Sequence, residues 1–210
     1  MRPNVDLALR AGARLGPTGA VSVNEYMEAG PPGVYVAGDV AEAVNKLTGE
    51  PTWIPLATYA NKMGYVAGTN AGLNGRFVRF PPIAGVSITK FRHMYIGSAG
   101  LTEEEARRRG LLGEVAKITT ADKARYMIEV NNITLKAVSD REGRLLGVQI
   151  VGFTPAVAGL LDLAAQFLGR PADELFYGEY SYMPYTATPW HPLTIVGRLF
   201  LRGRIKPLNS

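Results

Sequence analysis

With 210 residues, of which 47% are hydrophobic and 20% charged, the chain has an ordinary globular composition and can bury a core in one domain or two small ones. It contains no cysteine, which excludes a disulfide, a thiolate metal site and a cysteine nucleophile within these residues. The net charge of +5 is mild and dispersed, so nucleic acid is not indicated as a partner, and no apolar run approaches the roughly 18 residues of a membrane span. The amino terminus lacks the apolar core of a signal peptide, so we expect a cytoplasmic location.

The first part of the chain has the pattern of an α/β domain. Turn signals precede two short predicted strands, 20–23 and 34–37, and the second stops at Gly38 and is followed by Asp39. Open α/β sheets bind ligands at the carboxyl ends of their strands, so Asp39 is a candidate ligand contact. The glycine allows close approach, and a carboxylate suits a hydrogen bond from a sugar or sugar-alcohol hydroxyl. A buried strand followed by an Asx turn or a helix cap is the open alternative.

A helix is predicted from Pro55 onward. Apolar residues recur at intervals of three and four from Leu56 to Ala67, and proline suits the first turn of a helix. The segment 79–82, Arg-Phe-Pro-Pro, breaks this pattern. We therefore place a domain boundary there and expect domains at residues 1–82 and 83–210.

The second domain has the pattern of antiparallel strands with helices. A capping box at Thr102 and Glu105 predicts a short helix, whose terminal arginines, 107–109, match the helix dipole better than they suggest a binding patch. Further expected elements are a strand over 87–96, a hairpin of strands 133–138 and 144–151 around the turn 140–143, and helices over 155–168 and 193–201.

Several short motifs are each weak alone but form a specific signal in their order and spacing. They are Arg2-Pro3-Asn4, the segment 33–39, Pro55-Leu56-Ala57, the segments 100–106 and 145–152, Tyr182-Met183-Pro184-Tyr185 and Pro189-Trp190-His191-Pro192. On these motifs the chain resembles the carboxyl-terminal half of the FAD-dependent pyridine nucleotide-disulfide oxidoreductases. Within them it is most similar to the branch of coenzyme A disulfide reductases, NADH oxidases and NADH peroxidases.

The resemblance implies a fold in two parts. Residues 1–82 would be an α/β remnant of a Rossmann-like FAD-binding domain, and residues 83–210 an α+β dimerisation domain with an antiparallel sheet. The second domain would pair two protomers into a homodimer and close each active site with residues from its neighbour. NAD(P)H would be the second cofactor of the complete enzyme.

The resemblance also implies a partial FAD site. Asp39, next to Gly38, would hydrogen-bond the ribityl chain, and the helix that begins at Pro55-Leu56-Ala57 would point its amino end at the pyrimidine ring of the flavin. Reduced flavin gathers negative charge there, and a helix amino terminus offers free N–H groups with roughly half a positive charge.

Tyr182 is the candidate catalytic residue. The resemblance places it near the redox sulfur of the partner subunit, where a phenol can donate a hydrogen bond to a developing thiolate or peroxide oxygen. A core or interface role, in a segment crowded with Tyr177, Tyr180 and Tyr185, is the open alternative. Tyr126 lies in a segment where related sequences carry tyrosines, although the residues after it depart from their pattern.

His191-Pro192 is similar to the general acid/base of glutathione reductase-like enzymes. The segment 193–196 supplies no acid to orient the imidazole, so this is the weaker interpretation. Trp53 and Trp190 have no cation-cage context in the sequence, and we expect both to serve packing.

The expected function is that of the carboxyl-terminal part of a flavoprotein oxidoreductase. Electrons would pass from NAD(P)H through FAD and a cysteine, absent here, to a disulfide such as CoA disulfide or polysulfide, or to peroxide or oxygen. The glycine-rich FAD fingerprint and the NAD(P)H domain are also missing, so the chain alone is expected to be inactive. A truncated frame, a fragment and a split enzyme with a separate N-terminal FAD/NAD-binding chain remain open. The alternatives are a non-catalytic dimerisation module and, on charge alone, an anion-binding domain that uses the basic segment 198–206.

Overall fold

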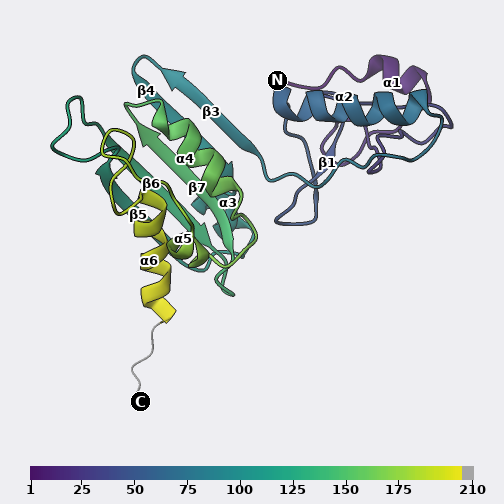
Figure 1. Cartoon of the computed structure of the whole chain (residues 1–210). Coiled ribbons are helices and arrows are strands. Elements are labelled where there is room, and N and C mark those ends of the chain that lie inside the picture. The colour runs from purple at the N-terminus through teal and green to yellow at the C-terminus, as the bar shows by residue number, and fades with distance from the viewer. Residues whose placement is uncertain (205–210) are drawn as a thin grey trace. The chain divides into compact units, whose positions relative to one another are not determined.

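The computed structural model describes residues 1–204, and the chain divides into two compact units, Met1–Ile83 and Ala84–Ser210. Lys206, one of the basic residues considered above, lies outside the described residues. The elements of the first unit are α1 (Asp6–Arg10), β1 (Ala43–Val44), β2 (Pro51–Thr52) and α2 (Ala57–Gly72) (Figure 1). Those of the second are β3 (Val86–Phe91), β4 (Met94–Gly100), α3 (Glu103–Arg108), β5 (Val115–Ala121), β6 (Asn132–Ser139), β7 (Leu145–Gly152), α4 (Ala156–Ala165), α5 (Glu174–Tyr177) and α6 (Pro192–Arg204).

The first unit is organised around the helix α2. The predicted helix is present, but it begins at Ala57, after the N-cap residue Leu56, and not at Pro55. Its inward face buries Met63 and Val66 against Phe80 and Ile83, and irregular segments of the same unit complete this core. Burying these side chains fixes the helix to the loops before and after it, because apolar area removed from water is the main favourable term in folding.

The two strands predicted before α2 are not formed as ladders. Within 34–37 only Tyr35 pairs, with Glu28, and within 20–23 only Val21 pairs, with single residues on either side. A strand needs a run of partners along its length, and within the described residues these two segments have only isolated pairs. The strand prediction was therefore wrong in extent, although the segment still ends in the turn at Gly38.

The second unit contains one five-stranded antiparallel sheet in the order β3-β4-β7-β6-β5. This confirms the antiparallel sheet expected for the α+β domain, and the predicted hairpin appears as β6 and β7. The single strand expected over 87–96 is instead the hairpin β3–β4, in which Phe91 pairs with Met94. Arg92, at the turn, has a left-handed φ of 53°, which a two-residue hairpin turn requires.

Two helices cover one face of this sheet. Figure 1 shows α4 and α6 on the same side, α4 against β4 and β7 and α6 against β5 and β6. Leu193, Val196 and Phe200 of α6 are fully buried or nearly so. These apolar side chains of α6 therefore belong to the core of this unit. No helix among residues 1–204 is both long and apolar enough to cross a membrane.

The short helix α3 begins with the capping box that the sequence predicts. The Thr102 hydroxyl accepts a hydrogen bond from the Glu105 N–H (3.2 Å), and the Glu105 carboxylate accepts one from the Thr102 N–H (2.8 Å). Arg107 forms an ion pair with Glu103 one turn before it (2.8 Å). This pairing within the helix agrees with a structural role for the arginine run.

Glycine substitutions test the packing of the second unit. A Cβ at Gly147 would overlap the carbonyl oxygen of Leu101, a backbone atom, whereas a Cβ at Gly159 on the exposed side of α4 meets nothing within 4 Å. We expect Gly147→Ala to destabilise the unit by about 1–3 kcal/mol or more. Gly159→Ala should stabilise it by about 0.5–1 kcal/mol. Denaturant unfolding followed by circular dichroism measures both, and equal effects would contradict the packing described.

Candidate functional site

The predicted ligand contact Asp39 lies in a tight turn. Gly38 has a φ of +83°, and its carbonyl accepts a hydrogen bond from the Ala41 N–H (2.9 Å). A Cβ at Gly38 would sit 3.5 Å from the Cβ of Ala60 in the first turn of α2, which is an ordinary contact. The left-handed backbone, and not a lack of space, therefore requires glycine here.

The backbone carbonyl groups of the turn at Asp39 are hydrogen-bonded, whereas its carboxylate is free. The Val40 carbonyl accepts from the Val21 N–H (2.8 Å), and the Asp39 carbonyl accepts from the indole N–H of Trp53 (2.8 Å). The Asp39 side chain is exposed and has no hydrogen bond or ion pair among residues 1–204. An acceptor with two free oxygens is thus presented on a fixed turn.

Glu42 is buried three residues after Asp39 and anchors the turn through hydrogen bonds. Its carboxylate, with the residue only 5% exposed, accepts hydrogen bonds from the N–H (2.8 Å) and hydroxyl of Thr18, and its N–H donates to the Val21 carbonyl (2.9 Å). Glu42 is not predictable from the sequence, because a lone acid outside any motif carries no periodic signal. Because Thr18 and Val21 already bind its polar groups, Glu42 stabilises the turn and is not a candidate ligand contact.

The amino end of α2 lies beside this turn. Leu56, the N-cap residue, makes no side-chain capping bond, and the first turn contains no acid. Ala57 and Thr58 are exposed residues, and their N–H groups have no acceptor within the described residues. This end of the helix therefore keeps its partial positive charge and its free donors. The free carboxylate and the free N–H groups fit the two parts of FAD that the resemblance assigns to them.

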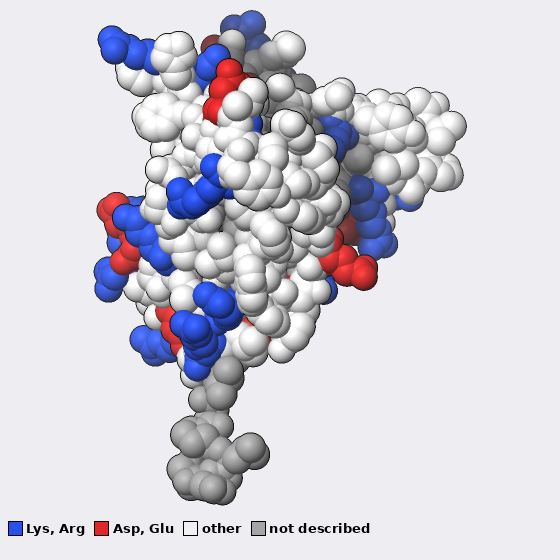
Figure 2. Space-filling model, turned by 60° about the vertical axis from the view of Figure 1, so that its left-hand side comes forward, with Lys and Arg blue, Asp and Glu red and all other residues white. Residues whose placement is uncertain are grey.

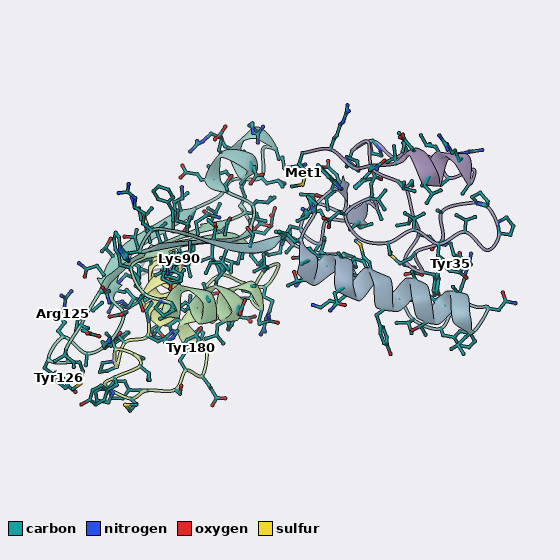
Figure 3. The ribbon with its side chains drawn as sticks, turned by 90° about the horizontal axis from the view of Figure 1, so that it is seen from above. Met1, Tyr35, Lys90, Arg125, Tyr126 and Tyr180 are labelled. Carbon is teal, nitrogen blue, oxygen red and sulfur yellow. The ribbon has the colours of Figure 1, made fainter. Side chains whose placement is uncertain are left out.

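In the second unit the structure brings Tyr182 and Tyr126 together. Their phenol groups share a hydrogen bond, and this bond is the main cause that raises the pKa of Tyr182 above its usual value. The two loops also meet through the Ala124 N–H and the Pro184 carbonyl (3.1 Å). Figure 3 shows Tyr126 on the loop that projects from the end of the sheet. Both tyrosines are exposed, so neither is a core residue.

His191 is a packing residue in this structure. Its ring stacks on that of Tyr180, labelled in Figure 3, with centroids 4.1 Å apart, and its Nδ1 accepts from the Leu193 N–H (3.3 Å) at the start of α6. Burial lowers the pKa of His191 to about 4, so the imidazole is neutral at pH 7. An imidazole with this pKa and these contacts is poorly suited to general acid/base chemistry near neutral pH.

The two tryptophans do more than the sequence analysis predicted. Trp53 donates to the Asp39 carbonyl, and Trp190 carries the guanidinium of Arg198 over its ring at 4.8 Å. Trp190 thus packs against a cationic side chain, because α6 brings the arginine to it from eight residues away. Arg198 is half-buried in this contact, which weakens the case for an anion-binding patch on α6. Among residues 1–204 no group of three His, Asp or Glu side chains could hold a metal ion.

The described chain is thus an α/β unit followed by an α+β unit with one antiparallel sheet. Residues 1–64 match the family described as pyridine nucleotide-disulphide oxidoreductase, and residues 86–184 match the dimerisation domain of that family. The chain belongs to the pyridine nucleotide-disulphide oxidoreductases.

Several characterised proteins are similar to this chain in sequence or in structure. The NAD(P)H sulfur oxidoreductase (CoA-dependent) of Pyrococcus furiosus is 42% identical over 202 residues, which are 95% of this chain and 45% of that protein. An NADH oxidase of Methanocaldococcus jannaschii is 33% identical over 198 residues, 93% of this chain and 43% of the oxidase. The solved NAD-dependent persulfide reductase of A. fulgidus has a TM-score of 0.90 at 31% identity, covering 97% of this chain and 38% of that one. The chain thus spans less than half the length of these relatives.

The environment of His191 predicts a pH dependence. Its pKa is about 4 in the folded chain against 6.5 for a free imidazole, so between these values the unfolded chain binds more protons. The contribution of His191 to stability is complete above about pH 6.5 and is lost as the pH falls towards 4. We expect His191→Asn to flatten the fall in unfolding free energy from pH 7 to pH 5, whereas His93→Asn, at the exposed β3–β4 turn, leaves it unchanged. An unchanged slope in His191→Asn would contradict the burial of a neutral imidazole.

Proposed function

We propose that this chain supplies one wall of the FAD site and the dimer interface of an NAD(P)H-dependent flavoprotein oxidoreductase. The observation that carries the proposal is the free Asp39 carboxylate on a fixed turn beside the uncapped start of α2. In this proposal residues 1–82 belong to the FAD-binding domain and residues 83–210 to the dimerisation domain.

The acceptor we favour is a sulfur compound such as a polysulfide, a persulfide or CoA disulfide. The names of the P. furiosus sulfur oxidoreductase and the A. fulgidus persulfide reductase support this choice. The NADH oxidase of M. jannaschii supports a second candidate, oxygen or peroxide. The cysteine that would distinguish these acceptors is absent from this chain.

The residues of the first unit would bind and orient the cofactor. Asp39 would accept a hydrogen bond from a ribityl hydroxyl, and Gly38 would hold the turn that aims it. The N–H groups of Ala57 and Thr58, after Pro55 and Leu56, would face the pyrimidine edge, where partial positive charge stabilises an anion. When bound, FAD would carry electrons between NAD(P)H and the acceptor.

Tyr182 would act on the acceptor bound by the other protomer. A tyrosine phenol is protonated at neutral pH, and the hydrogen bond with Tyr126 raises the pKa of Tyr182 further. A protonated phenol can donate a hydrogen bond to a thiolate or a peroxide oxygen as negative charge develops there. Tyr126 would orient the phenol through the bond between them.

Exposed aromatic and apolar side chains of the second unit support a homodimer. Tyr126 and Ile128 are 73% and 77% exposed, and further exposed members of this set are Tyr177, Tyr182, Met183, Tyr185 and Trp190. On the face of the molecule shown in Figure 2, charged side chains stand in separate groups around a broad uncharged area. Aromatic residues and methionine are enriched at protein interfaces, and lysine and acids are depleted there.

Flavin binding tests the cofactor proposal. We expect the purified chain to carry little or no flavin and to oxidise no NADH, because most of the binding surface for FAD lies outside it. In an NMR titration with excess FAD, the amides of Asp39, Ala57 and Thr58 should nevertheless shift. Asp39→Ala should weaken this binding about tenfold or more, the loss expected for one charge-assisted hydrogen bond.

A yellow preparation that oxidises NADH would refute the expected inactivity. The absence of any FAD-induced shift near Asp39, or equal binding by Asp39→Ala, would count against the FAD site itself. A chain that binds no FAD but dimerises would favour the non-catalytic dimerisation module.

Sedimentation velocity tests the dimer. We expect the chain to sediment as a dimer, and Ile128→Lys or Tyr185→Lys to shift it to the monomer by burying an unpaired charge. Leu73→Lys, at an exposed position of the first unit, serves as the control and should leave the dimer intact. A monomeric unmodified chain, or equal effects of all three substitutions, would contradict the proposed interface.

A further inference from the structure

We propose that Trp53 is a positioning residue of the FAD site, a role that rests on the function proposed above. Its indole N–H donates a hydrogen bond of 2.8 Å to the backbone carbonyl of Asp39, across fourteen residues of chain. Through this bond Trp53 holds the Asp39 carboxylate at a fixed place relative to the free N–H groups at the start of α2.

A short hairpin returns the chain so that this bond can form. β1 and β2 pair through Ala43 with Thr52 and Val44 with Pro51. The turn between them is closed by the Asn45 side chain, whose oxygen accepts from the N–H groups of Leu47 (2.8 Å) and Thr48 (3.2 Å). Trp53 follows β2 directly, so the hairpin brings the indole back to the turn from which the loop started.

Trp53 lies between the two proposed contacts with the cofactor. Only three residues separate it from Ala57, the first residue of α2, and its side chain contacts Asp39. A hydrogen bond is directional, so the bond from Trp53 fixes the orientation of the Asp39 peptide group in a way that the apolar packing on either side of the turn does not.

The indole is suited to this role because it combines an apolar ring with one donor. Phenylalanine would fill the same space and leave the Asp39 carbonyl without its partner. Other backbone groups of the turn have their own bonds, since the Gly38 and Val40 carbonyls accept from Ala41 and Val21. The bond from Trp53 is therefore a contact of the turn that a conservative side-chain substitution can remove.

Trp53→Phe in the full 210-residue chain tests the inference, with Trp190→Phe in the second unit as the matched control. We expect Trp53→Phe to speed hydrogen exchange of the Ala41 amide about three- to tenfold, the effect of losing one hydrogen bond. The Leu101 amide, in the second unit, should exchange at its original rate. The dissociation constant for FAD, from the NMR titration described above, should rise by a similar factor, while Trp190→Phe changes neither quantity.

A second form of the experiment covers a Trp53→Phe chain that fails to fold. In the Trp190→Phe background, tryptophan is replaced by benzothienylalanine, which keeps the bicyclic shape but has sulfur in place of the N–H group. Faster exchange at Ala41 with weaker FAD binding supports the positioning role, because a packing role would not respond to loss of the N–H alone. Unchanged exchange at Ala41 overturns the inference whether or not FAD binds. Faster exchange at Ala41 in a chain that shows no FAD-induced shifts supports the role of Trp53 in fixing the turn. That result counts only against the proposed function.

Discussion

The first unit depends on two separate anchors, one for the Gly38–Asp39 turn and one for α2. Met63 and Val66 fix the helix from its buried side, and Glu42 fixes the turn from behind through Thr18. Because both elements are anchored independently, their polar groups are not needed for the fold. The Asp39 carboxylate and the free N–H groups of α2 can therefore face outward, where a ligand can use them.

In the second unit, too, the buried core and the candidate functional residues lie on different segments. Strands β4, β6 and β7 and the helices α4 and α6 provide the buried core, and loops at the edge of that core carry Tyr126 and Tyr182. A rigid scaffold lets these loops meet without contributing much burial of their own. The exposed aromatic side chains that result are costly in water and are the physical basis for the proposed pairing of two chains.

Local signals in the sequence predicted the elements whose stability is local. The spacing of apolar residues predicted α2 and α4, and the Thr102 capping box predicted the start of α3, because each depends on residues within one or two helical turns. The predictions of strands over 20–23 and 34–37 were wrong in extent because a strand depends on pairing partners elsewhere in the chain. The prediction of a single strand over 87–96 was wrong because the segment contains no glycine, proline or asparagine at the turn. Arg92 adopts the left-handed backbone there without any sign of it in the sequence.

The sequence by itself determined the family and the residue types at the candidate site. The motif around Gly38 and Asp39 and the start of α2 are each continuous segments, so they can be recognised without the structure. Only the tertiary structure decided how those residues are held. The bond from Trp53 to Asp39, the stacking of His191 on Tyr180 and the pairing of Tyr126 with Tyr182 each join residues whose sequence separation carries no pattern. Such contacts form only when the hydrophobic core has already brought distant segments together, and no local signal in the chain can record them.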